Sequence, residues 1–225
     1  MSGLDELGFD VVANVVPAAA RSPLLAAFDE VVGERPGQRQ GLAHAAVRTL
    51  ACSPAVRALV EPVLGRSAFA FRATLFDKTP AANWWVGWHQ DRTVPVQQRV
   101  DLPGYGPWST KDGGWFVEPP AAVLAGLLAV RIDLDGSSPD NGALWVVPGT
   151  HRAGVLSPTA IATLVAGGSP PALCGVVPVG GALRMRPLLL HRSGRGERPG
   201  HRRIVHLEFA AAEASERLPF AACVR

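Results

Sequence analysis

The stretch FAFRATLFDK, residues 69–78, decides the fold class, because its apolar residues recur at every second position. Phe69, Phe71, Ala73 and Leu75 occupy one set of alternate positions. The other set includes Arg72, Thr74, Phe76 and Lys78. A period of two predicts a β-strand. Since the segment before residue 66 has helical spacing instead, this stretch marks a change from a helical to a β-rich part of the chain.

Two apolar stripes with helical spacing precede the strand. They are Leu24, Leu25, Phe28, Val31 and Val32, and then Val56, Leu59, Val60, Val63 and Leu64. Ser53 and Pro54 are typical of an N-cap and a first helical position, and Gly65 is placed to end the second helix. We therefore predict helices over both stripes.

Several short strands are predicted after residue 78, separated by turn-forming segments. They cover residues 126–134, 143–147, 182–191 and 202–209. Helices followed by many short strands indicate an α+β fold that is mainly β, with a sandwich or barrel. Residues 97–118 show neither period, so we expect a long irregular insert that acts as a lid. The length of 225 residues fits a single domain over residues 1–225.

Composition excludes several classes of protein. Hydrophobic residues make up 48% of the chain and charged residues 18%, which is unlike a disordered protein. A net charge of +3 is too small to indicate nucleic-acid binding, and no apolar run is long enough to cross a membrane. Three cysteines far apart in the sequence predict neither a disulfide framework nor a cysteine zinc site. We expect a cytoplasmic protein whose partner is a small molecule; the sequence does not indicate the oligomeric state.

His89 and Asp91 lie two residues apart in the segment WHQD, so on an extended strand their side chains share one face. Near the C-terminus, His191 closes an apolar run, a turn follows, and the chain returns as a strand that carries Arg202. Two histidines and one carboxylate form the facial triad of non-haem Fe(II) oxygenases, which leaves coordination positions open. The residues His89, Asp91 and His191 are therefore the candidate metal ligands.

At this point the sequence resembles the phytanoyl-CoA dioxygenase-like family of Fe(II)- and 2-oxoglutarate-dependent oxygenases. WHQD at 88–91 is similar to the first iron segment of the family, NGALWVVPGTHRAG at 141–154 to a second signature, and FDKTP at 76–80 to a segment that precedes the iron ligands. The spacing of His191, Ser193 and Arg202 also matches the family. The resemblance implies a double-stranded β-helix (jelly roll), with the N-terminal helices packed on the outer face of one sheet.

The resemblance also implies roles for individual residues. Fe(II), 2-oxoglutarate and O2 would be used at His89, Asp91 and His191, with release of succinate and CO2. Arg202 would bind the distal carboxylate of 2-oxoglutarate through its fork of N–H groups, and Ser193 offers a hydroxyl to the same group. Lys78 and Gln90 are further candidates for the cosubstrate, although the middle residue of an alternating triplet faces away from the metal unless the strand bends.

Strand alternation favours Arg202 over its neighbour Arg203 as the cosubstrate anchor. Arg203 shares a largely apolar face with Val205, Leu207 and Phe209, whereas Arg202 shares the opposite face with His206.

The residue at position 91 also bears on the type of reaction. Family members that halogenate carry Ala or Gly at the carboxylate position, so the presence of Asp91 implies a hydroxylase or related oxidase.

Candidate substrate contacts are Trp85, Trp108, Trp115 and Arg131. The tryptophans also fit a packing role, and Arg131 fits an ion pair with Asp133. Two other functions stay open at this stage: a cupin-like metal enzyme that works without 2-oxoglutarate, such as an isomerase or hydrolase, and a non-catalytic jelly-roll binding protein. The substrate itself is not indicated by the sequence.

Overall fold

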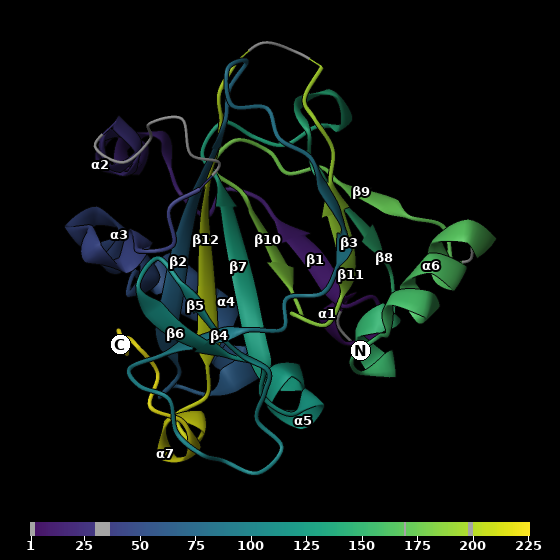
Figure 1. Ribbon diagram of the computed structural model, residues 1–225. Coiled ribbons are helices and arrows are strands. Elements are labelled where there is room, and N and C mark those ends of the chain that lie inside the picture. The colour runs from purple at the N-terminus through teal and green to yellow at the C-terminus, as the bar shows by residue number, and fades with distance from the viewer. Residues whose placement is uncertain (1–2, 30–36, 169, 198–199) are drawn as a thin grey trace.

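Two antiparallel sheets face each other in the computed structural model, which describes residues 3–29, 37–168, 170–197 and 200–225 (Figure 1). The larger sheet has the strand order β1-β10-β7-β12-β2, and the smaller has the order β3-β11-β8-β9. The strands of the larger sheet are β1 (Phe9–Val12), β2 (Phe69–Lys78), β7 (Leu127–Asp133), β10 (Ala182–Met185) and β12 (Arg202–Ala210). Those of the smaller sheet are β3 (Val86–His89), β8 (Leu144–Val147), β9 (Leu173–Gly175) and β11 (Leu190–Ser193). This is the predicted double-stranded β-helix.

The helices of the N-terminal part cover the outer face of the larger sheet (Figure 1). They are α2 (Ala18–Asp29), α3 (Ala45–Ala51) and α4 (Pro54–Leu64), after the short α1 (Gly3–Glu6). Phe28 and Val56 from these helices pack in one cluster with Val205, Leu207 and Phe209 of β12. The predicted helical covering of one sheet is therefore confirmed, and the opposite face of β12 is left free for polar residues.

The second predicted helix has the termini that its sequence indicates. Ser53 is the N-cap of α4 and accepts a hydrogen bond from the backbone N–H of Val56, while Gly65 ends the helix with φ of 82°. For the first helix, Leu24 and Phe28 are buried as expected. Val31 and Val32 lie outside the described residues.

Residues 182–191, predicted as one strand, form two strands that belong to different sheets. β10 ends at Met185 and β11 begins at Leu190, so the chain crosses from the larger to the smaller sheet between them. Pro187 lies in this crossing, where it has no N–H to offer to a ladder. Apolar side chains before and within the crossing are buried, among them Met185, Leu188 and Leu189.

Residues 97–118, expected to be irregular, contain a β-hairpin. β5 (Trp108–Lys111) and β6 (Gly114–Val117) pair with each other, and β4 (Val94–Val96) pairs with β6. Asp112 and Gly113 both have positive φ, at 50° and 79°, which is the conformation of a tight two-residue hairpin turn. The Asp-Gly pair was the sequence signal for this turn, but the strands beside it are short.

The remaining helices close the ends and edges of the two sheets. They are α5 (Ala121–Ala125), α6 (Pro158–Gly167), α7 (Ala214–Arg217) and the 3-10 turns η1 (Gly41–Ala43), η2 (Pro139–Asn141) and η3 (Thr150–Ala153). Of these, α6 packs Ile161 and Leu164 on the outer side of the smaller sheet. None of the described helices combines the length and apolar character that a membrane crossing requires.

Candidate metal centre and cosubstrate pocket

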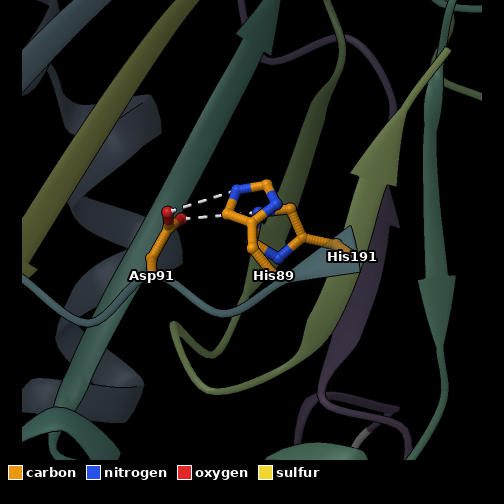
Figure 2. A group of neighbouring side chains, drawn as sticks. All are labelled: His89, Asp91 and His191. Carbon is orange, nitrogen blue, oxygen red and sulfur yellow. Dashed lines mark ion pairs between the residues drawn. The ribbon is translucent and has the colours of Figure 1, made fainter. Parts of the chain in front are cut away.

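The three predicted metal ligands meet at one point between the sheets (Figure 2). His89 at the end of β3 pairs in register with His191 of β11, and Asp91 follows β3 by two residues. The Nε2 atoms of His89 and His191 lie 3.8 Å and 3.7 Å from the Asp91 carboxylate oxygens. One candidate ligand atom from each residue lies within 4.8 Å of the others, which is the spacing that a single metal ion needs.

Backbone carbonyls orient both imidazole rings. Nδ1 of His89 lies 2.8 Å from the carbonyl oxygen of Gly87, and Nδ1 of His191 lies 2.8 Å from that of Leu189. Because a carbonyl only accepts, each Nδ1 carries the proton and each Nε2 keeps its lone pair for a metal. The backbone therefore selects the tautomer that binds metal.

The charge states of these residues also suit a divalent cation. Burial alone would raise the pKa of Asp91, but His191, His206, His89 and Arg72 hold it well below its ordinary range. Burial lowers the pKa of His191 to about 4, although the Asp91 carboxylate acts in the opposite direction. At neutral pH the centre consequently offers an anionic oxygen from Asp91 and an uncharged nitrogen atom from His191.

A cavity of about 1150 Å³ opens in front of the three ligands and runs between the sheets. Its wall on the larger sheet carries Arg72, Arg131, Arg202, His206 and Glu208, which face the metal ligands of the smaller sheet. A smaller cavity of about 240 Å³ lies on the other side of Arg202 and borders Lys78. Arg202 lines both cavities.

Arg202 is buried in this wall with hydrogen-bonding capacity to spare. Only 3% of its surface is exposed, and its Nε and Nη1 atoms have no hydrogen-bond partner. Burial and the charge of Arg131 lower its pKa to about 10, so it is a cation at neutral pH. A buried cation with unused N–H groups fits the distal carboxylate of 2-oxoglutarate.

Sequence comparison assigns the family. A family model described as phytanoyl-CoA dioxygenase (PhyH) matches residues 6–204, which is most of the chain. The chain belongs to the phytanoyl-CoA dioxygenase family. Membership in this family, together with the His–Asp–His centre, confirms the predicted iron, 2-oxoglutarate and O2 chemistry. No protein of curated function matches the sequence.

Solved structures of other proteins share this fold. Apo EctD from S. alaskensis superposes with a TM-score of 0.72 at 19% identity, covering 99% of this chain and 84% of that chain. HygX from Streptomyces hygroscopicus with iron bound has a TM-score of 0.66 at 18% identity, covering 93% and 84%. AviO1 from Streptomyces viridochromogenes Tue57 has a TM-score of 0.65 at 21% identity, covering 93% and 92%. At such identities the likeness concerns the fold.

In this phytanoyl-CoA dioxygenase family member, Lys78 and Ser193 lie beside Arg202 and contact each other. Lys78 pairs in register with Arg202, and its Nζ donates to the Ser193 hydroxyl at 2.8 Å and to the Gly194 carbonyl. The Ser193 hydroxyl donates in turn to the carbonyl oxygen of Gly142 at 3.0 Å. In this arrangement Ser193 positions Lys78 and keeps no proton for a cosubstrate carboxylate.

Gln90 points away from the cavity, as strand alternation predicts for the middle residue of the triplet. Its side-chain nitrogen donates to the carbonyl oxygens of Leu188 and Gly154, at 2.7 Å and 2.9 Å. Its side-chain oxygen accepts from the backbone N–H of Leu156 at 2.8 Å. Gln90 is therefore not placed to bind 2-oxoglutarate, and it holds together the loops behind the metal centre.

The three tryptophans predicted as substrate contacts lie outside the described lining of the main cavity. Trp85 is 61% exposed, and Trp108 and Trp115 contact each other edge to face in the hairpin. A different tryptophan, Trp84, lines the cavity, and its ring lies 5.3 Å from Lys78 Nζ. Residue type alone could not show whether Trp84 or Trp85 faces the cavity, because the chain bends between β2 and β3.

Arg131, a candidate substrate contact, lines the main cavity. In the described part of the chain no carboxylate lies within ion-pair distance of it, and Asp133 instead receives the hydroxyl of Ser137. Its Nη1 lies 3.4 Å from Nδ1 of His206, and its guanidinium lies over the ring of Phe76 at 5.8 Å. The expected alternative, an ion pair with Asp133, is not formed.

Five charged residues of the cavity lining were missed in the sequence: Arg39, Arg72, Lys111, Asp112 and Glu208. Arg72 and Glu208 lie opposite each other in register and form a buried ion pair through two hydrogen bonds, one of them 2.5 Å long. Strand parity was the available signal, since Arg72 shares a face with Lys78, and Glu208 shares a face with Arg202. For Arg39 and Lys111 the sequence offered no such signal, because both lie in segments without a clear period.

Proposed function

We propose that this protein is an Fe(II)- and 2-oxoglutarate-dependent hydroxylase that acts on a small organic metabolite and releases succinate and CO2. The observation that carries the proposal is the placement of His89, Asp91 and His191 opposite a buried Arg202 that has two free nitrogen atoms. A metal site alone would serve many reactions. The unpaired guanidinium across the cavity is specific to an anionic cosubstrate.

In this mechanism His89, Asp91 and His191 would hold the iron through one ligand atom each. Bound iron supplies the activation of O2 by oxidative decarboxylation of 2-oxoglutarate. Arg202 would hold the distal carboxylate of 2-oxoglutarate through its unpaired Nε and Nη1 atoms. Both rings keep their Nδ1 protons on backbone carbonyls throughout, so neither ring is needed as a proton donor.

Related structures support hydroxylation as the outcome but include a second reaction. EctD from S. alaskensis is known with 2-oxoglutarate and 5-hydroxyectoine bound, at a TM-score of 0.71 and 18% identity, covering 98% of this chain and 78% of that chain. SnoN, from nogalamycin biosynthesis, is a non-heme alpha ketoglutarate dependent epimerase. Asp91 is retained here, which favours hydroxylation over halogenation. Isotope incorporation separates hydroxylation from epimerisation.

The test is succinate formation by the purified protein with Fe(II), 2-oxoglutarate and O2, first alone and then with candidate metabolites. We expect succinate in both cases, more of it with a true substrate, and one oxygen atom from labelled O2 in the product. Asp91→Ala should abolish succinate formation. The matched control is Asp10→Ala, whose carboxylate pairs with Arg184 at the far edge of the larger sheet. Equal activity in both variants would contradict the proposal.

A further inference from the structure

The cavity has more positive than negative side chains among its described residues. Five cations line it: Arg39, Arg72, Lys111, Arg131 and Arg202. Three carboxylates line it: Asp91, Asp112 and Glu208. Under the proposed function, the iron ion adds two positive charges and 2-oxoglutarate adds two negative charges. The loaded cavity therefore keeps an excess of two positive charges, which is costly in a partly buried space.

Most of these charges already have partners. Arg72 pairs with Glu208, and Arg39 pairs with Asp112 at 2.8 Å. Arg202 is assigned to the cosubstrate and Asp91 to the metal. Lys111 and Arg131 are left without a carboxylate at ion-pair distance in the described chain.

Arg131 belongs to the cosubstrate half of the cavity. Burial lowers the pKa of both Arg202 and Lys78, and the charge of Arg131 lowers each pKa further. The Arg131 guanidinium lies over Phe76, two residues from Lys78 on the same strand. The dianionic cosubstrate is therefore the group that balances Arg131.

Lys111 lies at the end of β5, where the hairpin turns, and lines the same cavity as the metal ligands. Its Nζ lies 3.3 Å from the hydroxyl of Thr93, two residues beyond Asp91, and 5.1 Å from the centre of the Phe116 ring. One hydroxyl and one aromatic face leave the ammonium group with N–H donors to spare. The chain contains only two lysines, and each lines one of the two cavities.

We propose that the prime substrate carries an anionic group, a carboxylate or a phosphate, and that Lys111 binds it at the mouth of the cavity. An anion held beside Thr93 places the adjoining part of the substrate next to the metal centre. This proposal rests on the proposed function and adds the chemical class of the substrate. It makes Lys111 a specificity-determining residue, with no part in binding iron or 2-oxoglutarate.

The test uses inorganic phosphate as the probe, titrated by calorimetry into the full chain loaded with Fe(II) and saturating 2-oxoglutarate without oxygen. We expect one phosphate site, weakened at least about tenfold in Lys111→Met. The control is Arg66→Met, which removes an exposed cation outside both cavities. Absence of phosphate binding to the loaded protein, or equal binding by Lys111→Met, would overturn the proposal.

The 2-oxoglutarate titration that precedes this experiment separates the two proposals. If 2-oxoglutarate does not bind, the proposed function fails. If it binds equally well to the wild-type protein and to Lys111→Met, the variant is folded and the phosphate result reports on Lys111 alone. A second measurement compares carboxylic acids with their primary amides in the succinate assay. A neutral prime substrate whose kcat/KM is unchanged in Lys111→Met would independently overturn the assignment.

Discussion

The Arg202 guanidinium is buried in the wall of the larger sheet, with Nε and Nη1 unpaired and the cations Arg131 and Lys78 nearby. Such a group destabilises the empty protein, because a buried donor without an acceptor loses its bonds to water. The same arrangement strengthens the binding of an anion, since no partner has to be displaced. Arg202 is therefore best understood as half of an ion pair whose other half is the cosubstrate.

Replacing Arg202 by methionine tests this interpretation. We expect the Kd for 2-oxoglutarate to rise by about 100-fold or more, because the variant leaves a carboxylate buried without its charged partner. Isothermal titration into the Fe(II)-loaded protein measures the change. Arg203→Met is the control, since Arg203 pairs with Asp135 on the other face of β12. A similar loss of affinity in both variants would assign the effect to the strand and not to the guanidinium.

The protonation state of Lys78 should make the affinity for 2-oxoglutarate depend on pH. Burial, then the charges of Arg202 and Arg131, lower its pKa to about 7, and a bound dianion favours the protonated form. As pH rises above 7 the free protein loses this proton, so affinity should fall by up to about tenfold per pH unit, with proton uptake on binding. Titrations between pH 6 and 9 measure the slope. Lys78→Met should bind more weakly at pH 6 and lose the slope; an unchanged slope would assign it to another group.

At the scale of elements, helix ends that are marked by capping residues were predictable from sequence. Features that depend on which strands pair with each other were not. Ser53 and Gly65 mark the ends of α4 because capping is decided within a few residues. The split between β10 and β11 depends on which sheet each half of the segment 182–191 joins, and no local sequence pattern indicates that. The metal ligands were predictable from motif spacing, whereas the contact between Arg72 and Glu208 requires the register of β2 and β12.

Gln90 bonds to two other loop segments behind the metal centre, and its removal should lower the stability of the fold. In Gln90→Leu the carbonyls of Leu188 and Gly154 and the N–H of Leu156 lose their partner inside the protein. We expect the free energy of unfolding to fall by about 3 kcal/mol. Urea denaturation of the metal-free protein measures it, so the result does not depend on ligand binding. Gln97→Leu, which removes one bond of an exposed side chain to Phe220, should cost less than about 1 kcal/mol.

At the scale of the whole molecule, both histidine ligands of the metal lie in the smaller sheet, Asp91 directly follows its strand β3, and the cosubstrate anchor lies in the larger sheet. Occupying the site therefore joins the two sheets. With Ni(II) as a redox-inert substitute for iron, metal and 2-oxoglutarate at 100 times Kd should each stabilise the protein by about 2.7 kcal/mol, raising the thermal midpoint by roughly 5–10 °C per ligand.

Two variants separate the thermal shift caused by the metal from the shift caused by 2-oxoglutarate. His191→Ala should abolish the shift caused by the metal, whereas Arg202→Met should keep it and lose the further shift caused by 2-oxoglutarate. Differential scanning fluorimetry measures both. A metal shift that persists in His191→Ala would mean that the ion binds elsewhere, for which an exposed site at the surface is the alternative.

The helices on the outside of the larger sheet have a consequence for how this protein can change over evolution. Because β12 buries Val205, Leu207 and Phe209 against those helices, one large apolar cluster that stabilises the fold lies outside the barrel. The polar residues that line the cavity contribute chemistry more than cohesion. A lineage can thus exchange side chains such as Lys111 or Arg131, and acquire new specificities, without first having to find compensating changes elsewhere.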